Sequence, residues 1–333
     1  MTDELRVGIV GAGLIAGVHA DAYAATPGVV VTVVTDPVTD KAKRLADRIG
    51  GRAVASLDEL LDDGVDVVCI CTPPHAHAAP AVRAIKAGRH VFCEKPLAGR
   101  LDDARQIVAA ARSTNAVVMV GHVSRFEADH RLAKDLVAAG QLGRIAMMSH
   151  STTTSLPGWS EGGWLAQAEL SGGPIVDQGV HSFDYLGWLA DSPAVRVHAI
   201  GADSVAGPST YAVATVRYAS GAIGRVETSW AHPADRGFKL SSELVGTEGR
   251  LSWDSGHIIG GVMYVTGGPT EWFDPIGDRG YRAEMAAFVD AARSGGPSPV
   301  PVECGYEALR VALAARESIR TREPIDLTAW EPL

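Results

Sequence analysis

The stretch that decides the fold is LRVGIVGAGLIA, residues 5–16, in which a short apolar run leads directly into a glycine-rich turn. The run predicts a strand near residues 6–10, and the turn has the form G-x-G-x-x-A at the start of a predicted helix. Gly11 permits the tight turn, Gly13 lets the backbone approach a pyrophosphate, and Ala16 lets helix and strand pack closely. The helix N-terminus adds free N–H groups and the positive end of its dipole. We therefore expect a Rossmann dinucleotide-binding domain at this end of the chain.

A second mark of the same site is Asp36, which ends the next predicted strand 20 positions beyond Ala16. An acidic residue at this spacing binds the ribose hydroxyls of a dinucleotide. Its carboxylate also repels the 2′-phosphate of NADP, so we predict NAD, although the nearby Lys41, Lys43 and Arg44 favour NADP. Alone, the glycines indicate no more than a turn, and the acid no more than a helix cap or a surface residue. Together they predict a dinucleotide site.

The first third of the chain alternates short β-branched runs with helical patterns, which predicts a parallel sheet wound with helices. Thr39 is the expected N-cap of the second helix, and Gly50 follows its end. Because the strands are apolar throughout, we expect helices to cover both faces of the sheet. We therefore predict that residues 1–122 form a doubly wound Rossmann domain. Strands are expected near residues 6–10, 29–35, 65–70, 90–93 and 117–120, and helices near 38–48, 76–87 and 102–112.

After Gly121 the pattern changes, which predicts a C-terminal α/β domain over residues 123–333 for substrate binding and oligomerisation. The clearest strand pair flanks residues 219–221, and in its second strand Val226, Thr228 and Trp230 face opposite to their neighbours. This alternation indicates a large, mostly antiparallel open sheet with one solvated or ligand-facing side. Helices are expected near residues 128–139, 282–293 and 304–320.

Composition excludes several classes of protein. A net charge of −9 disfavours nucleic acid and anionic membranes as partners. No apolar run approaches the roughly 18 residues of a spanning helix, and no signal peptide precedes the first strand, so we expect a cytoplasmic protein. No C-x-x-C pair occurs among Cys69, Cys71, Cys93 and Cys304, so neither a disulfide nor a zinc site is predicted.

Three further segments complete the pattern: CTPPHAH at residues 71–77, EKPL at 94–97 and GGPIVDQGVH at 172–181. In this order and spacing they resemble the Gfo/Idh/MocA oxidoreductases, a family that includes glucose-fructose oxidoreductase and inositol dehydrogenases. The resemblance covers essentially the whole chain. It implies a nicotinamide across the carboxyl ends of the Rossmann strands, a sugar, polyol or related alcohol as substrate, and a homodimer or homotetramer. It maps the family's catalytic lysine, aspartate and histidine onto Lys95, Asp177 and His181.

The chemistry of these three residues supports that mapping. Pro96 biases Lys95 toward an extended backbone and so restricts where its ammonium group points. If Pro174 starts a helix, Asp177 and His181 lie four residues apart on one face, where the carboxylate can orient the imidazole. Histidine is the natural proton acceptor near neutral pH. A surface loop, an ordinary ion pair and a metal are the alternatives, and no third metal ligand has a motif, so no metal is predicted.

Our hypothesis is that His181 takes the hydroxyl proton while hydride leaves the same carbon, and that Lys95 stabilises charge on the oxygen. Which of the two is the final proton acceptor stays open, because coupled groups share apparent pKa values. The residues expected to bind the cofactor are Gly11, Gly13, Leu14, Ile15, Ala16, Asp36, Thr72, Pro73, His77, Glu94 and Lys95. Those expected to bind substrate are Lys95, Arg125, Trp159, Trp164, Asp177 and His181, with Tyr281 and His232 as further candidates.

Two other functions fit the same sequence. Within the family, an NAD-dependent glycosidase oxidises a sugar transiently to assist cleavage, and a transcriptional regulator binds nucleotide without turnover. No residue excludes the glycosidase, whereas a sensor has no need for Lys95, Asp177 and His181. The tryptophan faces suit sugar rings, and packing explains Trp159 and Trp164 equally well. We expect His75 to be exposed and His77 to lie near the cofactor.

Overall fold

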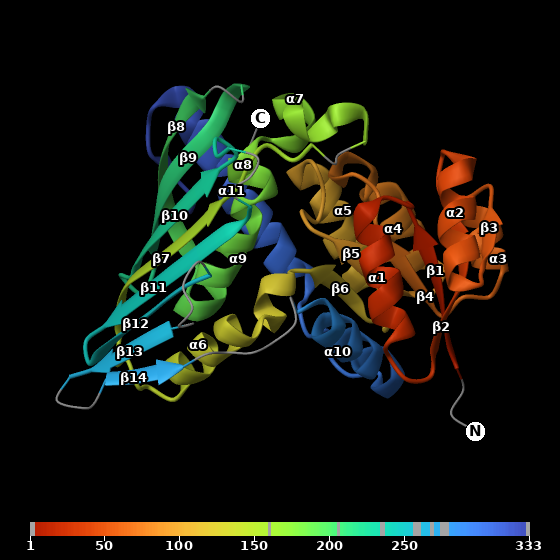
Figure 1. The fold of residues 1–333 in the computed structure, drawn as a ribbon, viewed down its shortest axis with the longest axis horizontal. Helices are drawn as coiled ribbons and strands as arrows, with labels where there is room; N and C mark the ends of the chain where they lie inside the picture. The colour runs from red at the N-terminus through yellow and green to blue at the C-terminus, as the bar shows by residue number, and fades with distance from the viewer. Residues whose placement is uncertain are drawn as a thin grey trace. The chain divides into compact units, whose positions relative to one another are not determined.

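The computed structural model describes residues 4–158, 161–204, 207–233, 237–255, 261–266, 270–273 and 280–330. The chain divides into two compact units, whose elements are labelled in Figure 1. The first unit comprises Met1–Phe126 and Asp278–Tyr306, and the second comprises Glu127–Gly277 and Glu307–Leu333. A single division after residue 122 therefore does not describe the chain, because the segment around residues 278–306 belongs to the first unit.

A six-stranded parallel sheet in the order β3-β2-β1-β4-β5-β6 forms the centre of the first unit. This is the strand order of a doubly wound dinucleotide-binding sheet, so the expected Rossmann fold is confirmed. Its strands are β1 Leu5–Val10, β2 Val29–Thr35, β3 Arg52–Val54, β4 Val67–Ile70, β5 His90–Glu94 and β6 Val118–Gly121. Around it lie α1 Leu14–Ala24, α2 Thr39–Ile49, α3 Leu57–Asp62, α4 Ala78–Lys86 and α5 Leu101–Arg112, with the 3-10 turns η1 Pro74–Ala76 and η2 Val123–Phe126.

The N-cap of the helix after β2 lies one residue earlier than the sequence pattern indicates. The N-cap of α2 is Val38 and not Thr39. The reason lies just before the helix, where the backbone nitrogen of Val38 donates to Oδ1 of Asp36 at 2.8 Å. At the other end Gly50 takes the left-handed conformation with φ 71°, as the sequence predicts. The short elements β3 and α3 were not expected, because three and six residues are too few to show a clear period.

Helix α10, Tyr281–Ser294, is the late segment that belongs to the first unit. It packs mainly against α1 and η2, and its Phe288 ring lies 5.7 Å from that of Phe92 on β5. Arg293 fixes its end by donating to the carbonyl of Pro27 at 2.8 Å. Further along, the backbone nitrogen of Val120 donates to the carbonyl of Val300 at 3.1 Å. These contacts explain why residues 278–306 belong to the first unit, although their position in the sequence predicted the second domain.

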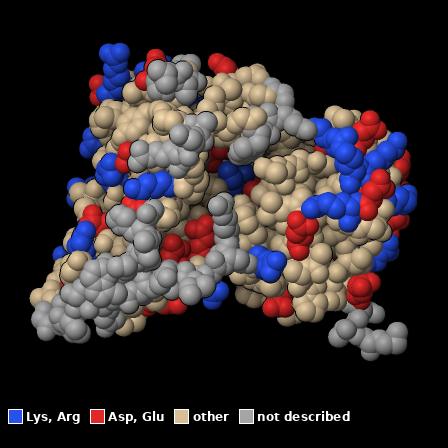
Figure 2. All heavy atoms as spheres, viewed as in Figure 1, with Lys and Arg blue, Asp and Glu red and all other residues tan. Residues whose placement is uncertain are grey.

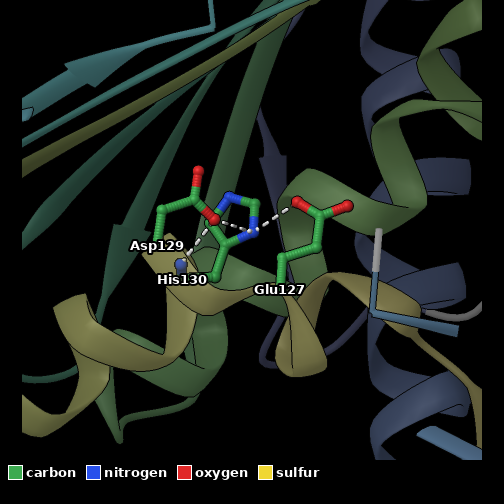
Figure 3. Close-up of side chains that lie close together, drawn as sticks. All are labelled: Glu127, Asp129 and His130. Carbon is green, nitrogen blue, oxygen red and sulfur yellow. Dashed lines mark hydrogen bonds and ion pairs between the residues drawn. The ribbon is translucent and has the colours of Figure 1, made fainter. Parts of the chain in front are cut away.

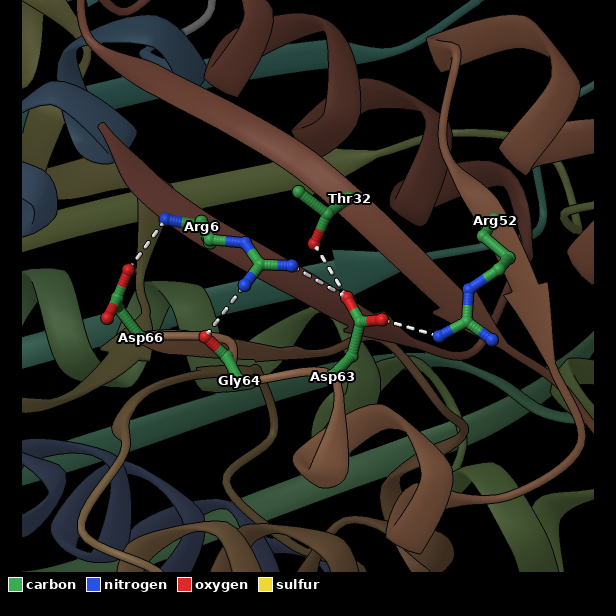
Figure 4. A network of polar contacts seen from close by, with 6 residues as sticks. All are labelled: Arg6, Thr32, Arg52, Asp63, Gly64 and Asp66. Carbon is green, nitrogen blue, oxygen red and sulfur yellow. Dashed lines mark hydrogen bonds and ion pairs between the residues drawn. The ribbon is translucent and has the colours of Figure 1, made fainter. Parts of the chain in front are cut away.

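Polar contacts hold together the end of this sheet that lies away from the glycine-rich turn (Figure 4). Asp63 pairs with Arg6 of β1 at 3.0 Å and also with Arg52 of β3. The backbone nitrogen of Arg6 donates to Oδ2 of Asp66 at 2.9 Å, and Thr32 of β2 donates to Asp63 at 3.5 Å. The network joins the edge strand to the centre of the sheet, although each such partly exposed pair contributes only about 0–1 kcal/mol.

The second unit is built on a sheet in the order β14-β13-β12-β11-β7-β10-β9-β8-β15. All neighbouring strands in it are antiparallel except β7 and β10, so the expected mostly antiparallel sheet is confirmed. The strands are β7 Ile145–Thr153, β8 Ala194–Ser204, β9 Gly207–Tyr218, β10 Ile223–Ser229, β11 Lys239–Gly246, β12 Gly249–Asp254, β13 Gly261–Val265, β14 Thr270–Phe273 and β15 Ile325–Asp326. The helices are α6 Ala128–Ala138, α7 Ala168–Ser171, α8 Pro174–Asp177 and α9 Gly179–Ala190, with the 3-10 turn η3 Glu161–Ala166.

The two faces of this sheet differ in burial. A row across the strands through Ser242, His150, Val226 and Ala214 is buried, and helix α9 packs on this face. In β10 the exposed Arg225 points to the opposite side. The strand pair around residues 219–221 and its alternation are as predicted.

The long helix α11, Val302–Thr321, runs from the first unit into the second. In the second unit Ser318 accepts a hydrogen bond from the backbone nitrogen of Ala199 at 3.0 Å, which ties the helix to β8. Within the described part of the chain, no helix combines the length and the apolar character needed to cross a membrane.

Candidate cofactor and catalytic site

Most of the predicted cofactor residues lie along one edge of the parallel sheet. Strands β2, β1, β4 and β5 are neighbours, and Asp36, Gly11, Thr72 and Lys95 follow their carboxyl ends. Open α/β sheets bind their ligands at this edge, next to the point where the strand order reverses. The topology therefore brings together residues that are far apart in the sequence.

The two glycines of the turn after β1 have different surroundings. Gly11 has φ +93°, and a Cβ there would lie 2.7 Å from the carbonyl oxygen of Cys71. At Gly13 a Cβ would meet no heavy atom of the described residues within 4 Å. This space lies at the N-cap of α1, where no side chain caps the helix, so backbone N–H groups are available to an anion. Ala16 is fully buried, while Leu14 is exposed. The turn fits a pyrophosphate.

Asp36 has a structural role that the sequence did not reveal. Its Oδ2 accepts from the backbone nitrogen of Ala12 at 2.8 Å, and its Oδ1 accepts from that of Val38. The carboxylate therefore joins the glycine-rich turn to the start of α2. Because each carboxylate oxygen has a second lone-pair direction, these two bonds leave acceptor capacity for ribose hydroxyls.

His77 links the loops that follow β4 and β5. Its Nε2 lies 2.7 Å from the carbonyl of Thr72, and its Nδ1 lies 3.0 Å from that of Pro96. Burial lowers the pKa of His77. The ring thus fixes the backbone around Thr72 and Pro73 against the segment that carries Lys95. His75 is exposed, as expected.

Lys95 is held at the end of β5 by its neighbour Glu94. Oε2 of Glu94 accepts from the backbone nitrogen of Lys95 at 2.9 Å, and Lys95-Pro96 is a cis peptide bond. The other oxygen, Oε1, lies 2.6 Å from Nε2 of His19 on α1. Glu94 is 6% exposed and His19 is fully buried, whereas Lys95 is partly exposed. Glu94 therefore acts on the backbone that positions the lysine.

The His19 and Glu94 side chains form a buried ion pair. Burial alone lowers the pKa of His19, but the hydrogen bond and charge of Glu94 outweigh it, so the pKa of His19 is raised. Burial alone raises the pKa of Glu94, but His19 and the charge of Lys95 outweigh it, so this pKa is lowered. The charged forms of both groups are thus favoured, which is how a buried pair remains ionised.

Asp177 and His181 lie in the second unit, on a helix that is interrupted between them. Pro174 starts α8 as predicted, but α8 ends at Asp177, and α9 begins at Gly179. A single helix through both residues was therefore wrong in detail. From Ser171 to Leu186, Asp177 and His181 are nevertheless partly exposed while every other residue is buried. The two side chains are the ones this segment presents to solvent.

The structure says less about the other residues that were predicted to bind substrate. Arg125 is half-buried in η2, and Trp164 is half-buried in η3. Trp159 lies outside the described residues. The Tyr281 ring packs edge-on against His19 at 5.8 Å, which makes it part of the support behind Glu94. His232 is half-buried next to β10.

Sequence reasoning missed two histidine groups. His19 is a single histidine within an apolar helix, and nothing in the sequence connects it with Glu94, 75 positions away. In the second unit His130 and His150 are buried against one another. The sequence indicates this group only through the closeness of Glu127 and Asp129 to His130, at the start of a predicted helix.

The strand order, the glycine-rich turn and the acid after β2 define the class: a Rossmann-type dinucleotide-binding protein with a second α/β unit. The comparisons with family models agree. Residues 5–122 match the model described as an oxidoreductase family with an NAD-binding Rossmann fold. Residues 130–252 match the Gfo/Idh/MocA C-terminal domain.

Similar proteins extend over the whole chain. A 1,5-anhydro-D-fructose reductase of Ensifer adhaerens is 32% identical over 97% of this chain and 98% of its own length. A myo-inositol 2-dehydrogenase of Thermotoga maritima is 26% identical over 97% of this chain and 98% of its own. Among solved structures, levoglucosan dehydrogenase in complex with NADH and levoglucosan is 25% identical, with a TM-score of 0.88 over 97% of this chain and 98% of that one. The chain belongs to the Gfo/Idh/MocA oxidoreductase family, and its first unit is an NAD-binding Rossmann domain.

Proposed function

We propose that this oxidoreductase is an NAD-dependent dehydrogenase that transfers a hydride between nicotinamide C4 and a secondary alcohol or ketone of a sugar, inositol or related polyol. The observation that carries the proposal is the position of Lys95, whose backbone nitrogen is fixed by Glu94 at 2.9 Å at the nucleotide edge of the sheet. The names of the relatives support the substrate class, since they act on an anhydro-sugar, an inositol and levoglucosan.

In this proposal NAD, when bound at the carboxyl edge, supplies the hydride acceptor. The ammonium group of Lys95 stabilises negative charge that develops on the substrate oxygen. His181 accepts the hydroxyl proton, and Asp177 orients its imidazole. A positioned general base of this kind is worth about 10²–10⁴-fold in rate. Arg125, Trp159 and Trp164 remain the proposed substrate contacts outside these three residues.

The choice of NAD over NADP rests on Asp36. Its two hydrogen bonds to Ala12 and Val38 hold the carboxylate next to the glycine-rich turn. A fixed negative charge at this place disfavours the extra phosphate of NADP electrostatically. NADP that binds more tightly than NAD in a calorimetric titration contradicts this assignment.

We further propose that the enzyme forms a homodimer or homotetramer through the open face of its second sheet. Ile200 is 64% exposed and Ile223 is 48% exposed, and by strand register both share the face of Arg225. Exposed apolar side chains on a broad sheet face indicate an interaction surface. A monomer in sedimentation at micromolar concentration argues against it.

A cytoplasmic location is also part of the proposal. All four cysteines are free, and Cys69, Cys71 and Cys93 are buried. Chains without disulfides are typical of reducing compartments.

The test is a screen of inositols, aldoses, anhydro-sugars and alkyl glycosides with NAD and, separately, NADP, in which NADH absorbance and aglycone release are both followed. We expect NADH to accumulate with at least one polyol or sugar. Lys95→Met and His181→Ala should each lose at least about 100-fold in turnover, while the matched surface variant Lys86→Met keeps it. Aglycone release without net NADH instead identifies the glycosidase reaction. Full turnover by Lys95→Met overturns the assignment of the site.

A further inference from the structure

A second group of chemically active side chains stands at the start of α6, in the second unit. Glu127, Asp129 and His130, here called the α6 cluster, each turn one ligand-type atom toward the others, and these atoms all lie within 4.8 Å of one another (Figure 3). The His130 side chain is fully buried, while the side chains of Glu127 and Asp129 are each 25% exposed. The cluster therefore has one buried nitrogen ligand and two carboxylates that solvent can reach.

The contact between His130 and Glu127 does not have the geometry of a hydrogen bond. Nδ1 of His130 lies 2.9 Å from Oε2 of Glu127, yet this buried nitrogen makes no hydrogen bond to any described residue. The oxygen is thus close to the nitrogen but off the direction of a ring N–H. A cation about 2.1 Å from both atoms produces such an offset, because it lies beside the line that joins them and not on it.

The opposite edge of the ring is fixed by a second histidine. Nε2 of His130 lies 3.3 Å from Nε2 of His150 on β7, and Nδ1 of His150 lies 2.8 Å from Oγ of Ser182 on α9. When His130 donates to His150 and His150 donates to Ser182, the lone pair of His130 Nδ1 is directed at the carboxylates. Metal-binding histidines are typically oriented by such a bond from the other ring nitrogen.

A buried tyrosine also lies against this histidine. The ring of Tyr185 is 4.1 Å from that of His130, and the Tyr185 side chain is fully buried. The buried ring thus keeps water away from the His130 side of the cluster.

Helix capping explains only part of the cluster. Oδ1 of Asp129 accepts from the backbone nitrogen of His130 at 2.8 Å, which is a local helix-start bond. Glu127 occupies the N-cap position, but its side chain makes no capping hydrogen bond. Its carboxylate turns to His130 instead (Figure 3).

We propose that Glu127, Asp129 and His130 bind one first-row divalent cation of the Mn²⁺ or Zn²⁺ type. One imidazole and two carboxylates suit these ions, whereas Ca²⁺ and Mg²⁺ prefer oxygen ligands throughout. The site is distinct from Lys95, Asp177 and His181. Its three ligands come from the start of α6, and the contacts of His130 with His150 and of His150 with Ser182 connect it to β7 and α9. It also departs from our expectation that the protein has no metal, which considered only sequence motifs.

The test uses the untagged full-length protein after treatment with a chelator, and Mn²⁺ as the probe, with binding measured by electron paramagnetic resonance. We expect one Mn²⁺ per chain, displaced by Zn²⁺ and not by equal Ca²⁺. Glu127→Gln and, separately, Asp129→Asn should each weaken binding about tenfold or more. Asp135→Asn, an exposed carboxylate on the same helix, is the matched control and should bind as the wild type does.

Circular dichroism establishes that each variant is folded, and a thermal melt gives a second readout. Mn²⁺ should raise the Tm of the wild type and of Asp135→Asn but not that of Glu127→Gln, because a ligand of the folded state stabilises it by mass action. No binding to the wild type at millimolar Mn²⁺ overturns the proposal. Equal binding by Glu127→Gln and Asp135→Asn overturns it as well.

Discussion

Each unit of this enzyme buries a histidine against a glutamate, and the two pairs are built differently. In the first unit His19 and Glu94 are 2.6 Å apart in a true hydrogen bond, and the glutamate side chain is only 8% exposed. In the second unit His130 and Glu127 are 2.9 Å apart without one, and the glutamate side chain is 25% exposed.

The difference separates a closed ion pair from an open site. Glu94 uses one oxygen for His19 and the other for the backbone of Lys95, so both of its oxygens already have partners within the first unit. Glu127 reaches solvent and leaves the His130 nitrogen unsatisfied. A histidine and a glutamate can therefore either fix the structure or remain available to a ligand. The outcome depends on the direction from which the carboxylate approaches the ring nitrogen and on whether water reaches the carboxylate.

Removal of charge from the closed pair should have the largest effect on stability. At about pH 6 we expect Glu94→Gln to lower the free energy of unfolding by about 3 kcal/mol, because the buried charge of His19 loses its partner. Turnover should fall as well, since the backbone of Lys95 loses its charged anchor. Urea unfolding of wild type and variant measures the first effect. A change below about 1 kcal/mol, the value of a surface pair, shows that the pair is not an ionised one.

The difference in free energy of unfolding between wild type and Glu94→Gln should depend on pH. Because the pKa of His19 is raised, the stabilisation that its charge gives the folded state is complete below the usual pKa of 6.5. This stabilisation is lost as the pH rises through the raised pKa. The lowered pKa of Glu94 means that its contribution is complete above its usual value of 4.5 and is lost as pH falls through the lowered one. The stability difference between wild type and Glu94→Gln should therefore be greatest between about pH 4.5 and 6.5 and smaller at about pH 9. A difference that does not vary with pH contradicts the ion pair.

The smallest effect is expected at the open pair when cations are removed. In the presence of a chelator, Glu127→Gln should change the free energy of unfolding by less than about 1 kcal/mol, because water already solvates this carboxylate. Parallel urea titrations of Glu94→Gln and Glu127→Gln provide the measurement. If Glu127→Gln loses more free energy of unfolding than Glu94→Gln, the contrast between the closed and the open pair is wrong.

The sequence predicts the parts of this molecule that are encoded locally. The turn from Gly11 to Ala16 lies within six residues, and the position of Asp36 depends only on the length of one helix and one strand. The alternation in β10 likewise follows from neighbouring residues. These features predicted the Rossmann fold, the open sheet and the nucleotide edge.

Features that depend on long-range packing were not predictable in this way. Helix α10 joins the first unit because Phe288 meets Phe92, and no local pattern encodes that contact. The His19–Glu94 pair joins a helix to a strand 75 positions later. The interruption at Gln178 was also missed, because a four-residue spacing between Asp177 and His181 looks the same in a continuous helix and in an interrupted one.

The central claim is hydride transfer from a carbinol carbon to NAD, with Lys95 in the site. The most direct measurement uses a substrate found in the screen with deuterium on that carbon and analyses the reduced cofactor by mass spectrometry and NMR. The account predicts that wild-type enzyme transfers deuterium to nicotinamide C4, and that Lys95→Met binds NAD but transfers it at least about 100-fold more slowly. Reduced cofactor without deuterium, or undiminished transfer by Lys95→Met, contradicts the account.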